Sequence, residues 1–353
     1  MTVYDAKALK KFVEDVLVKQ NVKKENAEVV ADSLIRADLE GITSHGISRL
    51  PIYSKRLKEG RINPTPSIKI QKKGLSILTV DGDNGLGQIA SYYGIKEGIK
   101  TARETGVAAI AIRKSNHFGC ASYYCKAACD ENLAAIVMTN SPPGIPPWGG
   151  KKAFFGTNPI AFGFPVKNGP DVIIDMSASV VARGKIIEAA KEGKAIPKGW
   201  AIDQRGNDTE DPAEALNGAV LPSGGVKGYG WALAVEILTG LLTGAAYGPH
   251  VENIYDDNGQ IANVGHFFIL IDIEKFMPVD QFTSLLQKML LEMKAVPKKE
   301  EVHTILYPGE RREQSYIHKL HCGIHLSQEV EKDLVQLANQ LHLEFPTTGD
   351  HYV

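Results

Sequence analysis

The stretch VAAIAIRKSNHFG, residues 107–119, sets the fold class of this chain. Its apolar run VAAIAI has the length of a buried strand, and LAAIVMT at 133–139 is a second such run. An alanine- and cysteine-rich segment with helical character separates the two runs. Strands that alternate with helices in this way indicate an α/β fold. The SNHFG turn that follows the first run places Ser115, Asn116 and His117 at the edge of the core.

Further strands are expected on both sides of this centre, and helices at both ends of the chain. Asp5 caps a helix with one apolar face, and Ser327 caps another near the C-terminus. Because helical ends enclose an α/β middle, we expect the two ends to form one domain. That domain comprises residues 1–70 with 312–353, and residues 71–311 form the second. The additional strands are expected in SIKIQ, SILTV, IAFGFPV, VIIDM and HFFILIDI.

Composition is typical of a globular protein with a full-sized core. The chain has 353 residues, of which 43% are hydrophobic and 23% charged, with a formal net charge of −1. This balance favours neither nucleic acid nor an anionic membrane as a partner. The N-terminal stretch has charges where a signal peptide needs an apolar core, so a cytoplasmic location is expected. Residues 229–248 resemble a membrane span, but Glu236 within them favours a helix buried in the α/β core.

Cysteine and histidine clusters suggest no disulfide framework and no metal centre. Cys120, Cys125 and Cys129 lie on one expected helix and are interpreted as small buried side chains. HKLHCGIH at 318–325 contains residue types that bind zinc. However, Gly323 is expected to end the helix there, so no metal site is predicted.

Two glycine-rich segments are candidates for a phosphate-binding loop. Gly85-x-Gly87 nearly fits the dinucleotide fingerprint, but the expected strand ends too far before it and no acidic residue ends the next strand. The loop PSGGVKGYG at 222–230 is a better cradle, because Lys227 adds a positive charge and a long helix follows directly. A flexible loop without a ligand remains an alternative at this point.

Two histidines in polar, glycine-containing turns are the candidate proton-transfer groups. His45 lies in TSHG at 43–46 and His117 in SNHFG. Histidine exchanges a proton near neutral pH. Arg49 and Tyr53 follow His45 at intervals of one helical turn. A base, a bidentate cation and a phenol that converge on one small anion suit the chemistry of 2-hydroxy acids.

The motifs together resemble those of the malate/L-lactate dehydrogenase family, the type-2 lactate/malate dehydrogenases, which includes sulfolactate and ureidoglycolate dehydrogenases. They occur in family order over roughly residues 1–340. The matching stretches are SHG (44–46), DGDNGLGQ (81–88), SNHFG (115–119), TNSPPGIPPWGG (139–150), GTNPIAFGFP (156–165), IDMSAS (174–179), GGVKGYG (224–230), GHFFILID (265–272) and PGE (308–310).

The resemblance implies a mostly antiparallel, non-Rossmann nucleotide-binding sheet with a helical domain, a homodimer, and NAD or NADP as cofactor. It also implies that the Gly85 near-fingerprint binds no nucleotide. The proton-transfer residues are His45 and His117, without a choice between them. The substrate contacts are Ser44, Arg49 and Tyr53. The cofactor contacts are Ser141, Asp175, Met176, Ser177, Lys227, Gly228, Pro308, Gly309 and Glu310.

The expected reaction follows from these assignments. It is hydride transfer between NAD(P) and a 2-hydroxy acid/2-keto acid pair, and malate and oxaloacetate are the expected pair. Lactate, sulfolactate or ureidoglycolate as substrate remain alternatives, and so does a sensor that binds NAD(P) without this chemistry.

Overall fold

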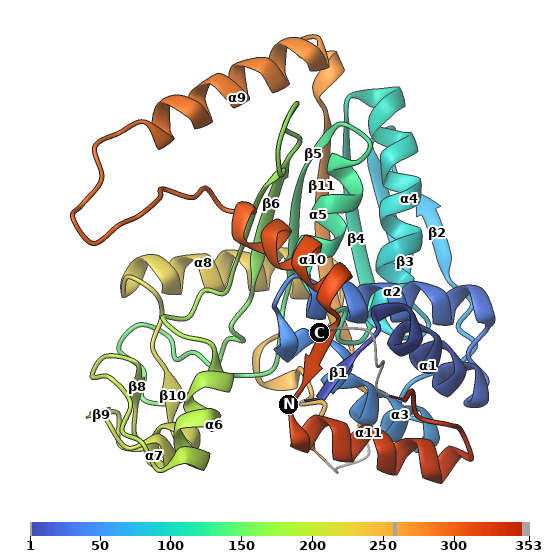
Figure 1. Ribbon diagram of the computed structural model, residues 1–353, viewed down its shortest axis with the longest axis vertical. Coiled ribbons are helices and arrows are strands. Elements are labelled where there is room, and N and C mark those ends of the chain that lie inside the picture. Colours follow the sequence, from blue (N-terminus) through green and yellow to red (C-terminus); the bar gives the residue numbers. More distant parts are fainter. Residues whose placement is uncertain (1, 257–259, 348–353) are drawn as a thin grey trace.

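A mixed seven-stranded sheet forms the centre of the molecule. The computed structural model describes residues 2–256 and 260–347, so residues 348–353 of the predicted helical domain lie outside the described part. The strands lie in the order β2-β3-β4-β11-β5-β6-β7 (Figure 1). Their bounds are β2 (Lys69–Lys72), β3 (Ile77–Asp81), β4 (Val107–Ser115), β5 (Leu133–Thr139), β6 (Ile160–Phe164), β7 (Val172–Met176) and β11 (Val264–Asp272).

The α/β prediction is confirmed, but the description of the sheet as antiparallel is too simple. β3 and β4 run parallel. Within the described sheet the other neighbouring strands run antiparallel. β3 and β4 can run parallel because a long helix, α4 (Gly87–Thr105), connects them, as a parallel pair requires.

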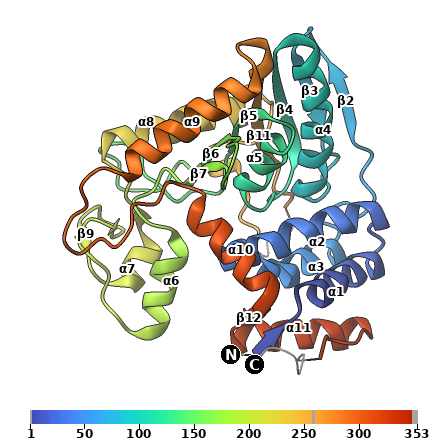
Figure 2. The same ribbon diagram turned by 45° about the horizontal axis from the view of Figure 1, so that its top comes forward.

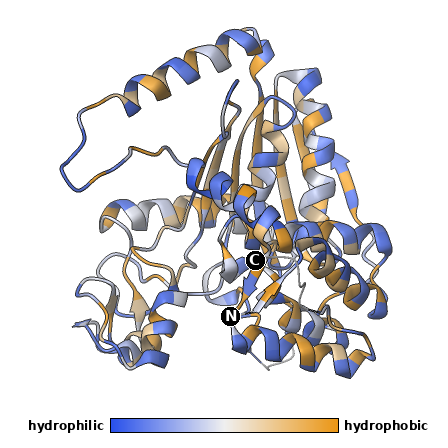
Figure 3. Ribbon diagram, viewed as in Figure 1, coloured by the Kyte–Doolittle hydropathy of each residue, from blue (hydrophilic) through white to orange (hydrophobic). Residues whose placement is uncertain are grey.

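Helices cover both faces of the sheet. The side chains of β4 alternate between the two faces and contact the helices on each. Ile110 and Ile112 pack with α4 and α5 (Ala121–Cys129), whereas Ala109 and Ala111 pack toward α8 (Val226–Glu236). Each large aliphatic side chain buried in this way contributes about 1.5–3 kcal/mol. Figure 3 shows the central strands as mainly hydrophobic, and Figure 2 shows the layers from a second direction.

Both ends of the chain contribute to one hydrophobic cluster beside the sheet. β1 (Thr2–Tyr4) pairs with β12 (Ile324–Leu326), and side chains from α1, α2, α3 and α11 pack together there. The predicted caps are confirmed, since Asp5 accepts the Ala8 N–H and Ser327 accepts the Val330 N–H. The domain boundaries stay a prediction. The helices concerned are α1 (Ala6–Lys19), α2 (Lys24–Leu39), α3 (Leu50–Lys58) and α11 (Gln328–Leu341).

The remaining elements lie along the β7 edge. A small sheet of β8 (Ala201–Ile202), β9 (Asp208–Thr209) and β10 (Ala219–Val220) packs with α6 (Arg183–Glu192) and α7 (Pro212–Asn217). α9 (Val279–Lys294) contacts the outer strands through Leu286 and Leu290. α10 (Glu310–Cys322) follows and packs on α2.

The prediction of a fully buried helix at 229–248 is wrong. α8 ends at Glu236 and continues as a π-helical turn, Ile237–Leu241. Trp231 and Leu242 are 54% and 60% exposed, because only one side of this segment rests on the sheet. Glu236 itself is buried and accepts hydrogen bonds from Asn158 Nδ2 and the Gly248 N–H, which explains a carboxylate at this depth. Among the residues described, no helix combines the length and apolar composition needed to cross a membrane.

Candidate active site

The structure brings His45 and His117 together from separate parts of the chain. His45 ends a short 3₁₀ turn, Thr43–His45, after α2. His117 lies in the loop between β4 and α5. Their ring centroids are 5.3 Å apart with 27° between the ring planes. The two predicted proton-transfer groups therefore face one another as a stacked pair.

Asp38 holds the turn that carries His45. Its Oδ2 accepts the Ile47 N–H at 2.7 Å, and its side chain is almost fully buried. A Cβ on Gly46 would lie 2.0 Å from Asp38 Oδ1, so only glycine allows the turn to close against the carboxylate. Burial raises the pKa of Asp38 to about 7, against the opposing effects of the Ile47 N–H and of Lys319.

Asn116 and Gly87 hold the loop that carries His117. Asn116 Nδ2 donates to Gly85 O at 2.8 Å and to Asn84 Oδ1 at 3.1 Å. A Cβ on Gly87 would lie 2.1 Å from Asn116 O. Gly87 of the near-fingerprint thus makes room for the backbone of the histidine loop, whereas Gly85 packs against Pro66. That these glycines bind no nucleotide stays a prediction.

His266 supports the same loop from inside the sheet, and the sequence did not reveal this role. Its Nε2 bonds to Ser115 Oγ and its Nδ1 to Thr139 Oγ1, both at 2.7 Å. Its ring stacks on Phe118 with centroids 4.4 Å apart. Burial lowers its pKa to about 3, so it stays neutral. The only signal in the sequence was one histidine in the otherwise apolar run GHFFILID.

Tyr53 is buried, and its hydroxyl is directed at His117. Tyr53 Oη lies 2.5 Å from His117 Nδ1, and Gln88 Nε2 donates to the same oxygen at 3.1 Å. Tyr53 is 1% exposed and Gln88 is fully buried. The predicted phenol therefore lies beside the histidine pair, where its hydroxyl is hydrogen-bonded to His117. Gln88, the last residue of DGDNGLGQ, was not among the predicted site residues.

Arg49 and Ser44 flank His45. Ser44 Oγ lies 3.0 Å from His45 Nδ1, and Arg49 Nε donates to Ser44 O at 2.6 Å. The Arg49 guanidinium also contacts the hydroxyl of Tyr255 and lies over its ring, 5.6 Å from the centroid. A fixed positive charge thus lies beside the histidine pair.

Both histidines are neutral in the free protein at pH 7. Burial and, to a lesser degree, the Arg49 charge lower the pKa of His45 to about 4, against the opposing effect of Asp175. Burial and the neighbouring His45 hold the pKa of His117 well below its usual range. Burial raises the pKa of Tyr53 to about 12, so its hydroxyl keeps its proton. Neutral imidazoles can accept a proton, and an anion bound beside them favours their charged form.

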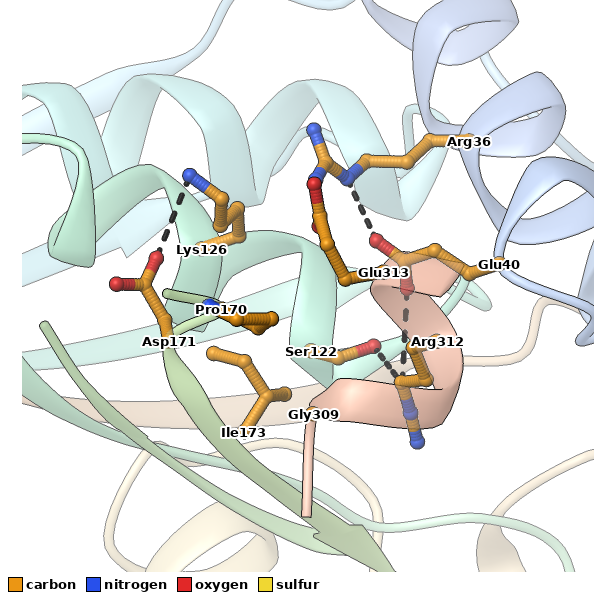
Figure 4. Close-up of a pocket in the computed structure, with 10 residues that line it drawn as sticks. All are labelled: Arg36, Glu40, Ser122, Lys126, Pro170, Asp171, Ile173, Gly309, Arg312 and Glu313. Carbon is orange, nitrogen blue, oxygen red and sulfur yellow. Dashed lines mark hydrogen bonds and ion pairs between the residues drawn. The ribbon is translucent and has the colours of Figure 1, made fainter. Parts of the chain in front are cut away.

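A polar pocket next to the site links the histidine turn to β7 (Figure 4). Arg312 of α10 donates to Ser122 Oγ at 2.6 Å and lies 3.7 Å from Glu40 Oε2 and 3.5 Å from Asp175 Oδ2. Glu40 also pairs with Arg36 at 2.7 Å. The network connects the end of α2, just before His45, with one of the predicted cofactor residues.

The predicted cofactor residues lie at both ends of β7 and in the loops joined to its carboxyl end. Asp175 and Met176 end the strand, and Ser177 follows. Pro308 lies alongside, since its carbonyl accepts the Ile173 N–H at 3.0 Å, and Gly309 and Glu310 continue from it. Ala178 then connects β7 to two further segments, the loop before α8 and the segment around Thr157. Its carbonyl accepts the Ser223 N–H, next to the loop with Lys227 and Gly228, and its N–H donates to Thr157 O. Ser141 Oγ accepts the Thr157 N–H at 3.0 Å.

The loop before α8 has the shape expected of a phosphate cradle. Gly224 and Gly225 both have positive φ, at 63° and 65°. A Cβ on Gly228 would lie 2.3 Å from Ser223 O. Lys227 is exposed in the first turn of the helix, where free N–H groups and the helix dipole favour anions. The residues present therefore fit a dinucleotide cofactor.

The histidine-rich tail does not form a comparable centre. His318 Nδ1 lies 3.8 Å from Cys322 Sγ, and Gly323 ends α10, so His325 belongs to β12. In the described residues no group of three or more possible metal ligands comes together. Cys120, Cys125 and Cys129 are buried as expected.

Comparison with known proteins shows that the chain is similar to dehydrogenases of small hydroxy acids. The chain is 40% identical over 341 residues to a malate dehydrogenase of Pyrococcus horikoshii, covering 94% of each protein. It is 38% identical to a (2R)-3-sulfolactate dehydrogenase (NADP(+)) of Chromohalobacter salexigens, covering 81% of this chain and 83% of that protein. It is 33% identical to a ureidoglycolate dehydrogenase (NAD(+)) of Escherichia coli O157:H7, covering 86% of each. All three relatives are named dehydrogenases, and the names of the last two give NADP(+) and NAD(+) as cofactor.

The chain belongs to the malate/L-lactate dehydrogenase family, whose model matches residues 4–335. The solved sulfolactate dehydrogenase of Methanocaldococcus jannaschii has the same fold, with a TM-score of 0.91, 39% identity and coverage of 98% of both chains. The predictions of family, of an NAD(P)-dependent 2-hydroxy-acid dehydrogenase, and of NAD or NADP as cofactor are confirmed.

Proposed function

We propose that this enzyme interconverts malate and oxaloacetate, with His117 as the group that exchanges the proton. The observation that carries the proposal is the stacked His45–His117 pair in a chain 40% identical to a malate dehydrogenase. Lactate, sulfolactate and ureidoglycolate are less favoured substrates. A sensor without catalysis is disfavoured because the residues for proton transfer lie together beside the proposed cofactor residues.

His117 is the better candidate for the acid/base because its far nitrogen is held by a buried partner. Tyr53 fixes Nδ1, so Nε2 is the nitrogen left for the substrate. A base oriented by a third group recurs in proton-transfer sites. In oxidation, hydride leaves C2 of the hydroxy acid, the hydroxyl proton passes to the imidazole, and the C=O bond forms. His45 lies stacked against the His117 ring.

Arg49 holds the substrate carboxylate in this proposal. Its guanidinium offers paired donors and keeps its charge at any physiological pH. Ser44, directly before His45, contributes a hydroxyl to the same anion. Fixing the carboxylate orients C2 for transfer, which is the main contribution of a protein when the cofactor supplies the redox chemistry.

The cofactor residues divide into groups with different tasks. Gly228 and Lys227, in the first turn of α8, hold the phosphates. Ser141, Asp175, Met176, Ser177, Pro308, Gly309 and Glu310 line the remaining length of the cofactor around the end of β7. When bound there, NAD(P) supplies the hydride acceptor or donor.

A screen of both cofactors against several keto acids tests the proposal. NADH or NADPH oxidation is followed by absorbance with the keto acids of malate, lactate, sulfolactate and ureidoglycolate. The proposal requires the highest kcat/KM with oxaloacetate. A higher value with another keto acid rejects malate, and cofactor binding without oxidation of any of them rejects the enzyme assignment.

A homodimer is part of the same proposal. α9 has alternating hydrophobic and hydrophilic residues along its length (Figure 3), and Leu285, Met289 and Leu291 on it are more than half exposed. Trp231 and Leu242 are exposed in the same way in the segment that begins with α8. A second copy would remove this apolar surface from water. Light scattering on the purified protein distinguishes the dimer from a monomer.

A further inference from the structure

Two separate N–H or O–H groups approach one nitrogen of His117. Tyr53 Oη lies 2.5 Å from Nδ1, and the Gly119 N–H is directed at the same atom at 3.4 Å. A backbone N–H can only donate. Nδ1 is therefore an acceptor in this arrangement, and the single proton of the neutral ring is on Nε2.

The hydrogen bond from Gln88 also indicates that Tyr53 donates to His117 Nδ1. Its Nε2 donates to Tyr53 Oη at 3.1 Å, so the phenol oxygen accepts there and its own proton goes to His117. The chain runs from the amide through the phenol to the imidazole. In this form Nε2 of His117 donates a hydrogen bond, which can hold the oxygen of a keto acid but cannot remove a hydroxyl proton.

The oxygen of the Gln88 amide supplies the means to reverse this chain. Gln88 Oε1 is buried and has no hydrogen-bond partner among the described residues. The oxygen and nitrogen of an amide have nearly the same shape, so a half turn exchanges them without repacking. After that rotation Oε1 accepts a hydrogen bond from the Tyr53 hydroxyl, and Tyr53 Oη accepts one from Nδ1–H. The ring is then in its other neutral tautomer. Nε2 is then an open lone pair.

We propose that Gln88, acting through Tyr53, determines which nitrogen of neutral His117 carries the proton, and that rotation of its amide converts Nε2 of His117 between a hydrogen-bond donor and a base. Gln88 is thus a positioning residue, since it touches neither substrate nor cofactor. The inference deepens the proposed function and rests on it for the direction of catalysis. The tautomer itself can be tested without substrate.

The surroundings of Gln88 allow this exchange and shield it from solvent. Gln88 is fully buried, and Tyr53 is 1% exposed. Gly119 has a φ of 81°, and a Cβ on it would lie 2.8 Å from Ser33 Oγ and 3.6 Å from Gln88 Nε2. Ser33 Oγ is also buried without a partner in the described part of the chain. It borders the space beside the present Nε2 position, so after the rotation its hydroxyl can donate to Oε1.

NMR of protein labelled with ¹⁵N in histidine reads the tautomer directly, with the His117 signals assigned by their loss in His117→Gln. We expect the Nε2–H form in the free wild-type protein. In Gln88→Glu at pH 9, an ionised carboxylate can only accept, so Tyr53 must donate to it and His117 should change to the Nδ1–H form. The same tautomer in both proteins overturns the proposal.

Kinetics give a second test that a purely structural role would not affect. The pH profile of kcat/KM is measured in both directions with malate and oxaloacetate. In Gln88→Glu the acid/base pKa in this profile should rise by roughly one unit or more, because the protonated imidazole gains an acceptor chain. An unshifted profile in a folded Gln88→Glu protein contradicts the proposal.

Gln20→Met is the matched control. Gln20 also has a buried Oε1 without a partner in the described residues, and its Nε2 donates to Ser54 Oγ of α3 at 2.8 Å, next to Tyr53 in the sequence. This variant should leave both the tautomer and the pH profile unchanged. An equal shift in Gln20→Met shows a general effect of disturbing α3 and overturns the proposal.

Tyr53→Phe serves if Gln88→Glu does not fold. Without the phenol only the long Gly119 N–H contact, at 3.4 Å, still favours an acceptor at Nδ1, so the preference for the Nε2–H form weakens and the Nδ1–H tautomer should gain population. A single unchanged tautomer contradicts the relay. If the wild-type protein oxidises no cofactor with any keto acid, the proposed function fails, while the NMR result still decides the tautomer assignment.

Discussion

The turns that carry His45 and His117 meet at one place but are built differently. The His117 loop is held by buried polar groups, with Tyr53 and Asn116 each hydrogen-bonded to partners from α4 or the loop before it. The His45 turn lies nearer the surface, and its Nδ1 contacts only the exposed Ser44 hydroxyl among the described residues. Two similar motifs thus provide different environments, which suits one fixed proton carrier and one ring that borders the substrate.

His117→Ala should have the largest effect on turnover. Loss of a general acid/base costs about 10²–10⁴ in rate. We expect kcat to fall by that range while NADH binding, measured by fluorescence titration, stays intact because the residues proposed for the cofactor are elsewhere. Near-normal turnover in His117→Ala would show that His117 is not the proton carrier.

Arg49→Ala should act mainly on substrate binding. A hydrogen bond to a charged group contributes about 1.5–3 kcal/mol, so KM for oxaloacetate should rise roughly 10- to 100-fold. Arg49→Lys keeps the charge without the bidentate geometry and should recover only part of the loss. An unchanged KM in Arg49→Ala excludes this side chain from the substrate site.

His45→Ala should slow turnover less than His117→Ala. We expect a loss of roughly tenfold, about 1.4 kcal/mol, from removal of a polar neighbour that is not itself the proton carrier. The comparison of the two variants at equal, saturating cofactor is the decisive measurement. If His45→Ala is the more damaging substitution, the roles of the two histidines are reversed.

Asp38→Asn should affect the pH dependence of stability more than activity at pH 7. The Asp38 carboxyl has a pKa near 4 in the unfolded chain and about 7 in the folded protein. Between these values the folded state binds more protons, so the free energy of unfolding falls as pH rises. The total decrease from pH 4 to 7 is about 4 kcal/mol at 1.36 kcal/mol per unit.

Urea unfolding of wild type and Asp38→Asn at several pH values measures this difference. Asparagine can still accept the Ile47 N–H but does not titrate, so the decrease assigned to Asp38 should disappear. Parallel pH curves for the two proteins would show that the pKa of the Asp38 carboxyl is not raised by folding.

The sequence was sufficient for the α/β class and for the histidine pair, because apolar runs of strand length and polar turns after them are local features. It could not show how deep a side chain lies. Tyr53 was expected at the substrate, but its hydroxyl is enclosed and bonded to His117. Trp231 was expected inside and lies outside, since a continuous apolar segment does not reveal which side the sheet covers.

Gln88 and His266 were missed for a related reason. Each reaches the site only because α4 or β11 lies next to the His117 loop in three dimensions, and neither has a motif of polar neighbours. The close contact of Gly87 with Asn116 O depends on that same packing.

The most direct test of the central claim is a crystal structure of the enzyme with NAD(H) and a non-reactive keto-acid analogue. The account predicts the analogue oxygen within about 2.6–3.2 Å of His117 Nε2, its carboxylate on Arg49, and the nicotinamide across from the two rings. A cofactor bound away from β7, or an analogue oxygen beyond reach of both imidazoles, would contradict it.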